Sequence, residues 1–258
     1  MYALITGASS GIGYEIAKIL AKKHYHLIIV ARRLNRLEEL KKEIERKYHV
    51  HVITKECDVS KEENCYQLFN EVKHYPINIL INNAGFGKVG RFSNISLENE
   101  LDMIRTNIIA PHILTKLFIN QFRKGYILNV ASMAGFQPGP MMATYGASKA
   151  YILNLSLSVN YELKKHHKNI HITTLCPGPV NTEFNKVANA DFNLSSISAK
   201  RCAKEAIDGM FLKKHLVVPG KRMKLLRLAS KFSPLNIILP MEYNIQTKKT
   251  NPESRKEL

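Results

Sequence analysis

The sequence predicts a single α/β domain built on a doubly wound parallel sheet with helices on both faces. Short apolar runs alternate with segments of helical periodicity along most of the chain, and a glycine-rich segment follows the first apolar run directly. With 258 residues, of which 45% are hydrophobic, the chain can bury one sizeable core. We expect the domain to span residues 1–220 and a basic amphipathic extension to occupy residues 221–258.

The first element is a strand over residues 2–5 that runs directly into a glycine-rich turn and then a helix. In this arrangement the free N–H groups of the helix N-terminus offset the charge of a pyrophosphate, and each glycine permits a tight turn or close approach. The sequence therefore predicts a dinucleotide site. Its expected cofactor-binding residues in this turn are Gly7, Ser9, Ser10, Gly11, Ile12 and Gly13.

A second apolar run, residues 26–30, predicts the next strand, and Arg32 and Arg33 follow it. NAD-binding folds usually place an acid at this point, about 20 residues past the glycines, to hold the ribose 2′-hydroxyl. A guanidinium instead suits a 2′-phosphate, and Ser9 can add a hydroxyl donor. We therefore expect NADP(H) as the cofactor. The alternative is that both arginines merely begin a solvated helix.

Four further strands are expected over residues 50–53, 77–81, 126–130 and 170–175, each followed by polar or small residues. The carboxyl ends of parallel strands meet at one edge, where ligands bind. The expected cofactor contacts after the third and fourth strands are Asp58, Val59, Asn82, Ala84 and Gly85. Asp58 can accept a hydrogen bond from adenine or, alternatively, cap the helix that follows it.

Tyr145 and Lys149 carry the expected chemistry. Positions i and i+4 share one helix face, so the ammonium lies near the phenol. A phenol titrates near 10 and needs a shift of about 3 units to act as a base at neutral pH. The lysine charge and an oxidised nicotinamide both favour the phenolate. Ser132, at the end of an earlier strand, can polarise a carbonyl.

Over residues 2–185 these features together resemble the short-chain dehydrogenase/reductase family. The resemblance rests on the glycine-rich turn, Asp58, residues 82–85, Asn107, Ser132, Tyr145, Lys149 and residues 177–182, in order and at the family's spacing. It implies a Rossmann-type sheet and assigns substrate orientation to Ser132, proton transfer to Tyr145, and ribose binding with pKa lowering to Lys149.

The resemblance implies further roles for three residues: Asn107 holds a proton-relay water, and Val180 and Thr182 line the nicotinamide carboxamide. The basic residue after the second strand matches the NADP-preferring branch. That branch often carries another basic residue where this chain has Ser10, so NADPH preference is expected to rest mainly on Arg32. Members of the family commonly form homodimers or homotetramers.

The predicted function is NADP(H)-dependent interconversion of a carbonyl and an alcohol by hydride transfer. Two alternatives stay open: a non-catalytic NADP(H)-binding regulator, and a protein associated with a membrane surface. The substrate is expected to be an uncharged ketone or aldehyde. Its expected pocket wall consists of Met133, Phe136, Pro138, Met141 and Met142, with a lid over residues 185–198. Ordinary packing or a subunit contact would also explain these apolar side chains.

The formal net charge is +17, and residues 221–258 contribute nine Lys/Arg against three Glu. Apolar and basic residues alternate over residues 221–232, and an apolar piece over residues 235–239 lies between two prolines. We expect a basic amphipathic helix followed by a hydrophobic segment. It can pack on its own domain or a partner subunit, rest on an anionic membrane, or extend the substrate lid.

The remaining composition excludes several classes. The basic residues are spread along the chain without an aromatic platform, so no nucleic-acid binding is expected. Four cysteines without CxxC spacing predict reduced thiols and no metal site. No signal peptide or spanning segment is predicted, and we expect a cytoplasmic protein.

Overall fold

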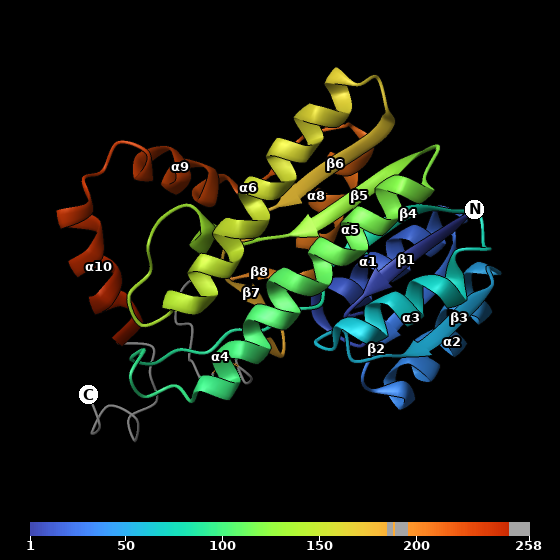
Figure 1. The fold of residues 1–258 in the computed structure, drawn as a ribbon, viewed down its shortest axis with the longest axis horizontal. Coiled ribbons are helices and arrows are strands. Elements are labelled where there is room, and N and C mark those ends of the chain that lie inside the picture. The colour runs from blue at the N-terminus through green and yellow to red at the C-terminus, as the bar shows by residue number, and fades with distance from the viewer. Residues whose placement is uncertain (185–187, 189–195, 248–258) are drawn as a thin grey trace.

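A parallel seven-stranded sheet forms the centre of the molecule in the computed structural model, which describes residues 1–184, 188 and 196–247. Its strand order is β3-β2-β1-β4-β5-β6-β9 (Figure 1). The strands are β1 (Tyr2–Thr6), β2 (His26–Ala31), β3 (Val52–Glu56), β4 (Ile77–Asn82), β5 (Lys124–Val130), β6 (Asn169–Leu175) and β9 (Leu216–Val217). The order reverses between β1 and β4, which opens a crevice at the strands' carboxyl ends.

Helices cover both faces of this sheet, as predicted. The helices α1 (Gly11–Lys22), α2 (Leu34–Tyr48) and α8 (Ala199–Phe211) bury leucine, isoleucine and alanine side chains against one face. The other face is covered by α3 (Glu62–Val72), α5 (Ala110–Gln121) and α6 (Ala143–Lys165). Because both faces are covered, the central strands are almost continuously apolar, and the core lies in two layers on either side of them.

A helical segment with an internal π turn precedes α5. It runs through α4 (Leu97–Ile104) and the turn Arg105–Ile109 directly into α5. A π turn within a helix is often found at a functional site. Here it carries Asn107, whose side chain is buried.

The six predicted strands are confirmed, with ends that differ by at most three residues. Three short strands were not predicted: β9 at the sheet edge and the pair β7 (Val180–Asn181) and β8 (Ile197–Ser198). Two residues are too few to show an alternating pattern, so their sequences carry no strand signal.

Two helices follow the sheet, α9 (Lys221–Ser230) and α10 (Leu235–Thr247), and lie at one end of the molecule (Figure 1). Pro240, which follows the apolar piece, lies inside α10, because the helix continues through it. The carbonyl that loses its helical donor belongs to exposed Asn236, where water can replace the bond. Within the part of the chain that is described, no helix combines the length and the apolar character needed to cross a membrane.

Candidate active site

One cavity of about 760 Å³ lies at the carboxyl ends of the strands. It collects most of the predicted site residues: Gly7, Ser9, Ser10, Gly11, Ile12, Arg32, Arg33, Asp58, Val59, Ala84, Gly85, Ser132, Tyr145, Lys149, Val180 and Thr182. Gly13, Asn82 and Asn107 are the predicted residues that do not line it. Elements far apart in sequence therefore converge on a single site.

The glycine turn fits a pyrophosphate. Gly7 and Gly11 have φ values of +66° and +58°, a region that favours glycine. A Cβ on Gly13 would collide with the carbonyl oxygen of Gly7, so this glycine allows α1 to pack closely on the turn without touching the cavity. The N-cap Ser10 makes no side-chain capping bond, and the first turn of α1 contains no acid. Its free N–H groups are suited to an anionic ligand.

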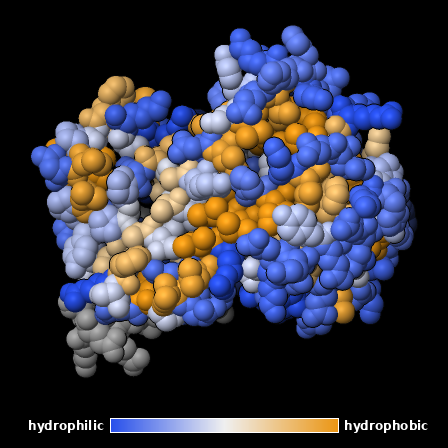
Figure 2. Space-filling model, viewed as in Figure 1, coloured by the Kyte–Doolittle hydropathy of each residue, from blue (hydrophilic) through white to orange (hydrophobic). Residues whose placement is uncertain are grey.

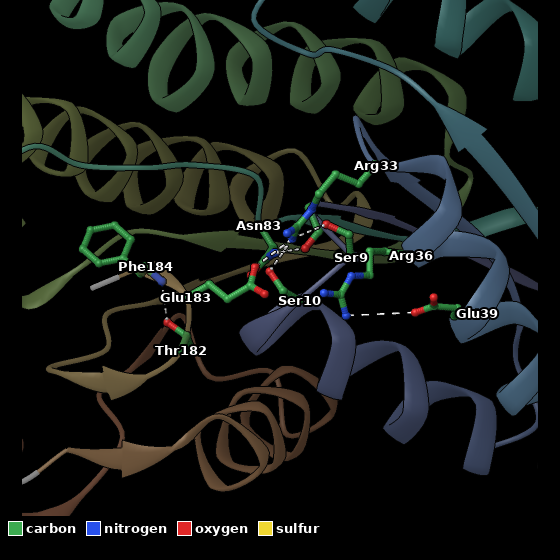
Figure 3. A network of polar contacts seen from close by, with 10 residues as sticks. Ser9, Ser10, Arg33, Arg36, Glu39, Asn83, Thr182, Glu183 and Phe184 are labelled. Atoms are coloured by element: carbon green, nitrogen blue, oxygen red, sulfur yellow. Dashed lines mark hydrogen bonds and ion pairs between the residues drawn. The ribbon is translucent and has the colours of Figure 1, made fainter. Parts of the chain in front are cut away.

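Arg33 lies beside this turn within a polar network (Figure 3). Its Nη2 donates hydrogen bonds to Ser9 Oγ at 3.0 Å and Ser10 Oγ at 3.1 Å, and pairs with Glu183 Oε2 at 2.9 Å. The hydrogen bond from Arg33 lowers the pKa of the Glu183 carboxyl. Glu183 comes from the segment after β7, so the pair joins two sides of the cavity. Arg32 also lines the cavity and has no hydrogen bond or ion pair among the described residues.

Asp58 faces the cavity and also bonds locally. Its Oδ1 accepts a hydrogen bond from the N–H of Ser60 at 3.1 Å, while the N-cap of α3 is Lys61. The alternative interpretation of Asp58 as the helix cap is therefore not observed, although its carboxylate does fix the turn before the helix. A Cβ on Gly85 would lie 2.8 Å from Asn107 Oδ1 and 3.2 Å from Lys149 Nζ, so the glycine leaves room for both side chains.

Ser132, Tyr145 and Lys149 lie together at the end of β5 and the start of α6. Ser132 and Tyr145 line the same cavity, and Ser132 Oγ accepts the N–H of Ala134 at 3.1 Å. Lys149 Nζ donates to the Val130 carbonyl at 2.9 Å and lies 5.8 Å from the centre of the Tyr145 ring. The spacing of Tyr145 and Lys149 thus places a phenol and an ammonium on one helix face.

Burial is the largest influence on the pKa values of Tyr145 and Lys149. It raises the pKa of Tyr145 to about 12, against the opposing hydrogen bond with Ser132. It lowers the pKa of Lys149 to about 8. The lowering of the phenol pKa expected from the sequence is therefore not found in the protein alone, because desolvation penalises the phenolate more than its neighbours favour it. At neutral pH the phenol is protonated and the ammonium is mostly charged.

Asn107 supports the site from behind. Its Oδ1 accepts the N–H of Phe86 at 3.1 Å, and its Nδ2 donates to the Phe86 carbonyl at 2.8 Å and to Ser148 Oγ at 3.1 Å. Ser148 in turn donates to the Tyr145 carbonyl at 2.7 Å. The π turn is thereby tied both to the segment that follows β4 and to the helix that carries Tyr145.

Asn82 also lies outside the cavity. Its Nδ2 donates to Thr115 Oγ1 at 3.0 Å and to Asn129 Oδ1 at 2.8 Å, and Asn129 donates to Ser156 Oγ at 2.9 Å. These buried amides and hydroxyls connect β4 and β5 with α5 and α6. Sequence reasoning did not find this network, because single polar residues inside apolar runs show no partner until the strands are paired.

Only part of the expected substrate wall faces the cavity. Met133 and Met142 line it, whereas Phe136, Pro138 and Met141 do not. Phe136 instead lies under the guanidinium of Arg227, 5.1 Å from its ring centre. Of the expected lid, residues 185–187 and 189–195 lie outside the described residues. Phe184 at its start does line the cavity, with its ring 5.5 Å from that of Tyr145.

Helices α9 and α10 complete the wall that the sequence did not locate. Their cavity-lining residues include Arg222, Met223, Leu226, Ile238, Met241 and Ile245. The side-chain amide of Gln137 donates to Glu242 Oε1 at 2.9 Å, which holds α10 against the loop after Ser132. The apolar spacing of this segment was visible in the sequence, but no pattern showed which surface would receive it. Glu183 was likewise missed, since a lone acid beside Thr182 has no distinguishing signal.

Comparison with known proteins supports one family. The model of the short chain dehydrogenase family matches residues 1–193. A very-long-chain 3-oxoacyl-CoA reductase of Vanderwaltozyma polyspora is 37% identical over 187 residues, which cover 66% of this chain and 53% of that protein. Hydroxysteroid dehydrogenase-like protein 1 of Gallus gallus is 33% identical over 227 residues, covering 85% of this chain and 67% of that one.

A solved structure agrees with these sequence relatives. A short-chain dehydrogenase from Sphingobium yanoikuyae in complex with NADPH superposes with a TM-score of 0.80 at 29% identity, covering 89% of this chain and 93% of that chain. This chain spans between about half and two thirds of the length of the two curated relatives. With its family-model match, its parallel sheet and its strand order, the chain belongs to the short-chain dehydrogenase family.

Proposed function

We propose that this protein is an NADP(H)-dependent oxidoreductase that interconverts a carbonyl and an alcohol. The observation that carries the proposal is the grouping of Ser132, Tyr145 and Lys149 in the same cavity as the glycine turn. A nicotinamide dinucleotide fits that turn because its N–H groups are uncapped and its glycines leave room. When bound, it supplies or accepts the hydride.

The protein groups account for the proton in carbonyl reduction. Tyr145, protonated at neutral pH because its pKa is about 12, donates its hydroxyl proton to the carbonyl oxygen. Ser132 Oγ already accepts the Ala134 N–H, so its own proton is free to be donated to the same oxygen. Lys149, with a pKa of about 8, is charged at neutral pH and stabilises the phenolate that remains. Asn107 does not line the cavity and its amide bonds Phe86 and Ser148, so the proton-relay water expected at Asn107 stays a prediction. The reverse reaction uses the same groups.

The preference for NADP(H) follows from the two arginines after β2. No carboxylate occupies this position to repel a 2′-phosphate, and Arg32 is exposed and unpaired among the described residues. Arg32 binds the 2′-phosphate without first releasing a partner, whereas Arg33 binds it only after giving up contacts to Ser9, Ser10 and Glu183. The NADPH complex of the Sphingobium yanoikuyae relative supports NADP(H) as the cofactor.

The substrate is an uncharged ketone or aldehyde. Met133, Met142 and Phe184 give the reacting end of the cavity an apolar surface. The cytoplasmic location and the homodimeric or homotetrameric state remain predictions.

The test is NADPH oxidation against a panel of aldehydes, aliphatic and cyclic ketones and quinones, with NADH in parallel. Turnover is expected with NADPH and is expected to disappear in Tyr145→Phe. Tyr151→Phe is the matched control, because Tyr151 lies on the same helix, is 40% exposed and bonds His112 at the surface. NADPH binding without turnover of any carbonyl or alcohol would instead support the non-catalytic regulator.

A further inference from the structure

The segment over residues 221–247 carries an unusual concentration of exposed apolar side chains. Among the described residues, seventeen large apolar side chains are exposed, and nine of them lie between Leu225 and Tyr243. Helix α9 has no buried residue, and Phe232, just after it, is 80% exposed. A monomeric soluble domain rarely gathers this much apolar surface in one place, so the segment is suited to a partner.

Seven of the nine do not face the cavity, and we call them the outer apolar surface. They are Leu225, Leu228, Phe232, Leu235, Ile237, Leu239 and Tyr243. Leu225 and Leu228 of α9 and Phe232 just after it are spaced by three and four residues, and in α10 Leu235, Leu239 and Tyr243 are spaced by four. Each set therefore forms one stripe along its helix. The space-filling view shows orange apolar atoms among blue ones on this part of the molecule (Figure 2).

Basic side chains accompany this surface. Residues 221–247 contain five Lys/Arg and one Glu. Lys221, Lys224 and Lys231 are exposed and form no ion pair with any described residue. Glu242, the single acid, is directed to Gln137 and Gln246 on the protein side. The outer surface is thus apolar and positively charged.

We propose that the outer apolar surface of α9 and α10 docks on the face of an anionic lipid membrane. Apolar side chains enter the boundary between headgroups and acyl chains, and the lysines contact the negative headgroups. A second copy of this chain is the less suitable occupant, because it would bring an identical positive charge to the contact. Binding of this kind is peripheral and weakens with salt.

The helices remain attached to the domain while they dock. Arg227 covers Phe136, Ile238 is 2% exposed, and Glu242 accepts from Gln137, all on the sides that face the protein. Docking therefore needs no unfolding of the cavity wall. The proposal is independent of the chemistry proposed above, and its test does not use activity.

The test is co-sedimentation of the full chain with vesicles. Binding is expected to vesicles of phosphatidylcholine and phosphatidylglycerol in equal parts, and not to pure phosphatidylcholine. The charge variant Lys224→Glu/Lys231→Glu is expected to weaken binding by roughly tenfold or more. The matched control Lys22→Glu/Lys42→Glu makes the same charge change at exposed positions of α1 and α2 and is expected to bind normally.

A second variant removes the apolar component. Leu225→Ser/Leu228→Ser/Phe232→Ser is expected to abolish vesicle binding, whereas Leu212→Ser, at a residue 68% exposed elsewhere, is expected to leave it intact. Circular dichroism and NADPH fluorescence verify that each variant is folded. Failure of the wild type to bind anionic vesicles would overturn the proposal. So would sedimentation velocity showing a wild-type dimer that the triple variant dissociates, since the surface would then bind a second copy.

Discussion

Replacing Glu183 with glutamine tests the electrostatics of the cofactor site. Arg33 and Glu183 are both 45% exposed, and their Nη2–Oε2 distance is 2.9 Å. An ion pair exposed to this degree contributes about 0.2–1 kcal/mol to stability. Arg33 loses this interaction energy when its guanidinium turns from Glu183 to a 2′-phosphate. The carboxylate also repels that phosphate. Glu183→Gln is therefore expected to tighten NADPH binding by roughly two- to tenfold and to leave NADH binding nearly unchanged.

The measurement is fluorescence titration of both cofactors at neutral pH. There the Glu183 carboxyl is ionised, because its pKa is lowered chiefly by the hydrogen bond from Arg33. Its stabilising contribution is lost only as the pH falls through that lowered pKa. Glu39→Gln is the matched control, since Glu39 pairs with Arg36 at 4.0 Å and does not line the cavity.

Two results would refute this reasoning. If the binding of NADPH and of NADH tightens equally, the carboxylate acts on the part of the molecule that both cofactors share. Arg33 then does not bind the 2′-phosphate. If Glu183→Gln tightens NADPH binding by as much when Arg33 is already methionine, the whole effect is direct repulsion by the carboxylate and none of it passes through this ion pair. The variant is expected to lower the melting temperature by only about 0.5–4 °C.

Four further outcomes are expected. A pH–rate profile of carbonyl reduction should show the rate falling above a pH of about 8, because Lys149 loses its charge there. The pKa of Lys149 in the folded protein lies below that of an unfolded lysine, so deprotonation favours the folded state. As the pH rises from about 7 to 11, urea unfolding should therefore show the wild type gaining about 3 kcal/mol of stability relative to Lys149→Met. Gly13→Ala should abolish NADPH binding or folding by collision with the glycine turn, whereas Gly139→Ala, with nothing within 4 Å of its Cβ, should be neutral in both assays. Ser156→Ala should leave the Asn129 amide without its acceptor and cost about 1–3 kcal/mol in thermal unfolding, with little change in turnover.

Much of the fold could be predicted from the sequence because it depends on local signals. Six strands were visible as apolar runs, and the glycine turn marked the start of α1. Ser132 and Asp58 each come soon after a predicted strand. They could therefore be placed at the carboxyl-terminal edge of the sheet from the sequence alone.

The remainder depends on contacts between distant segments. The ion pair of Arg33 and Glu183 joins positions 150 residues apart, and no local pattern indicates it. The spacing of Tyr145 and Lys149 reveals the neighbouring charge but not the extent of burial, which raises the pKa of Tyr145 in the protein without cofactor. Nor could the sequence show that Met133 faces the cavity while Phe136, three residues later, packs against Arg227.

The position of α9 and α10 has an evolutionary consequence. Every strand of the sheet precedes Lys221, so these helices shape the cavity without contributing a strand to the sheet. Substitutions on them can alter which molecules fit while the glycine turn and the helix of Tyr145 stay unchanged. Selection for a new substrate can therefore act on a terminal segment whose changes carry little risk of misfolding, which makes specificity the most readily altered property of this architecture.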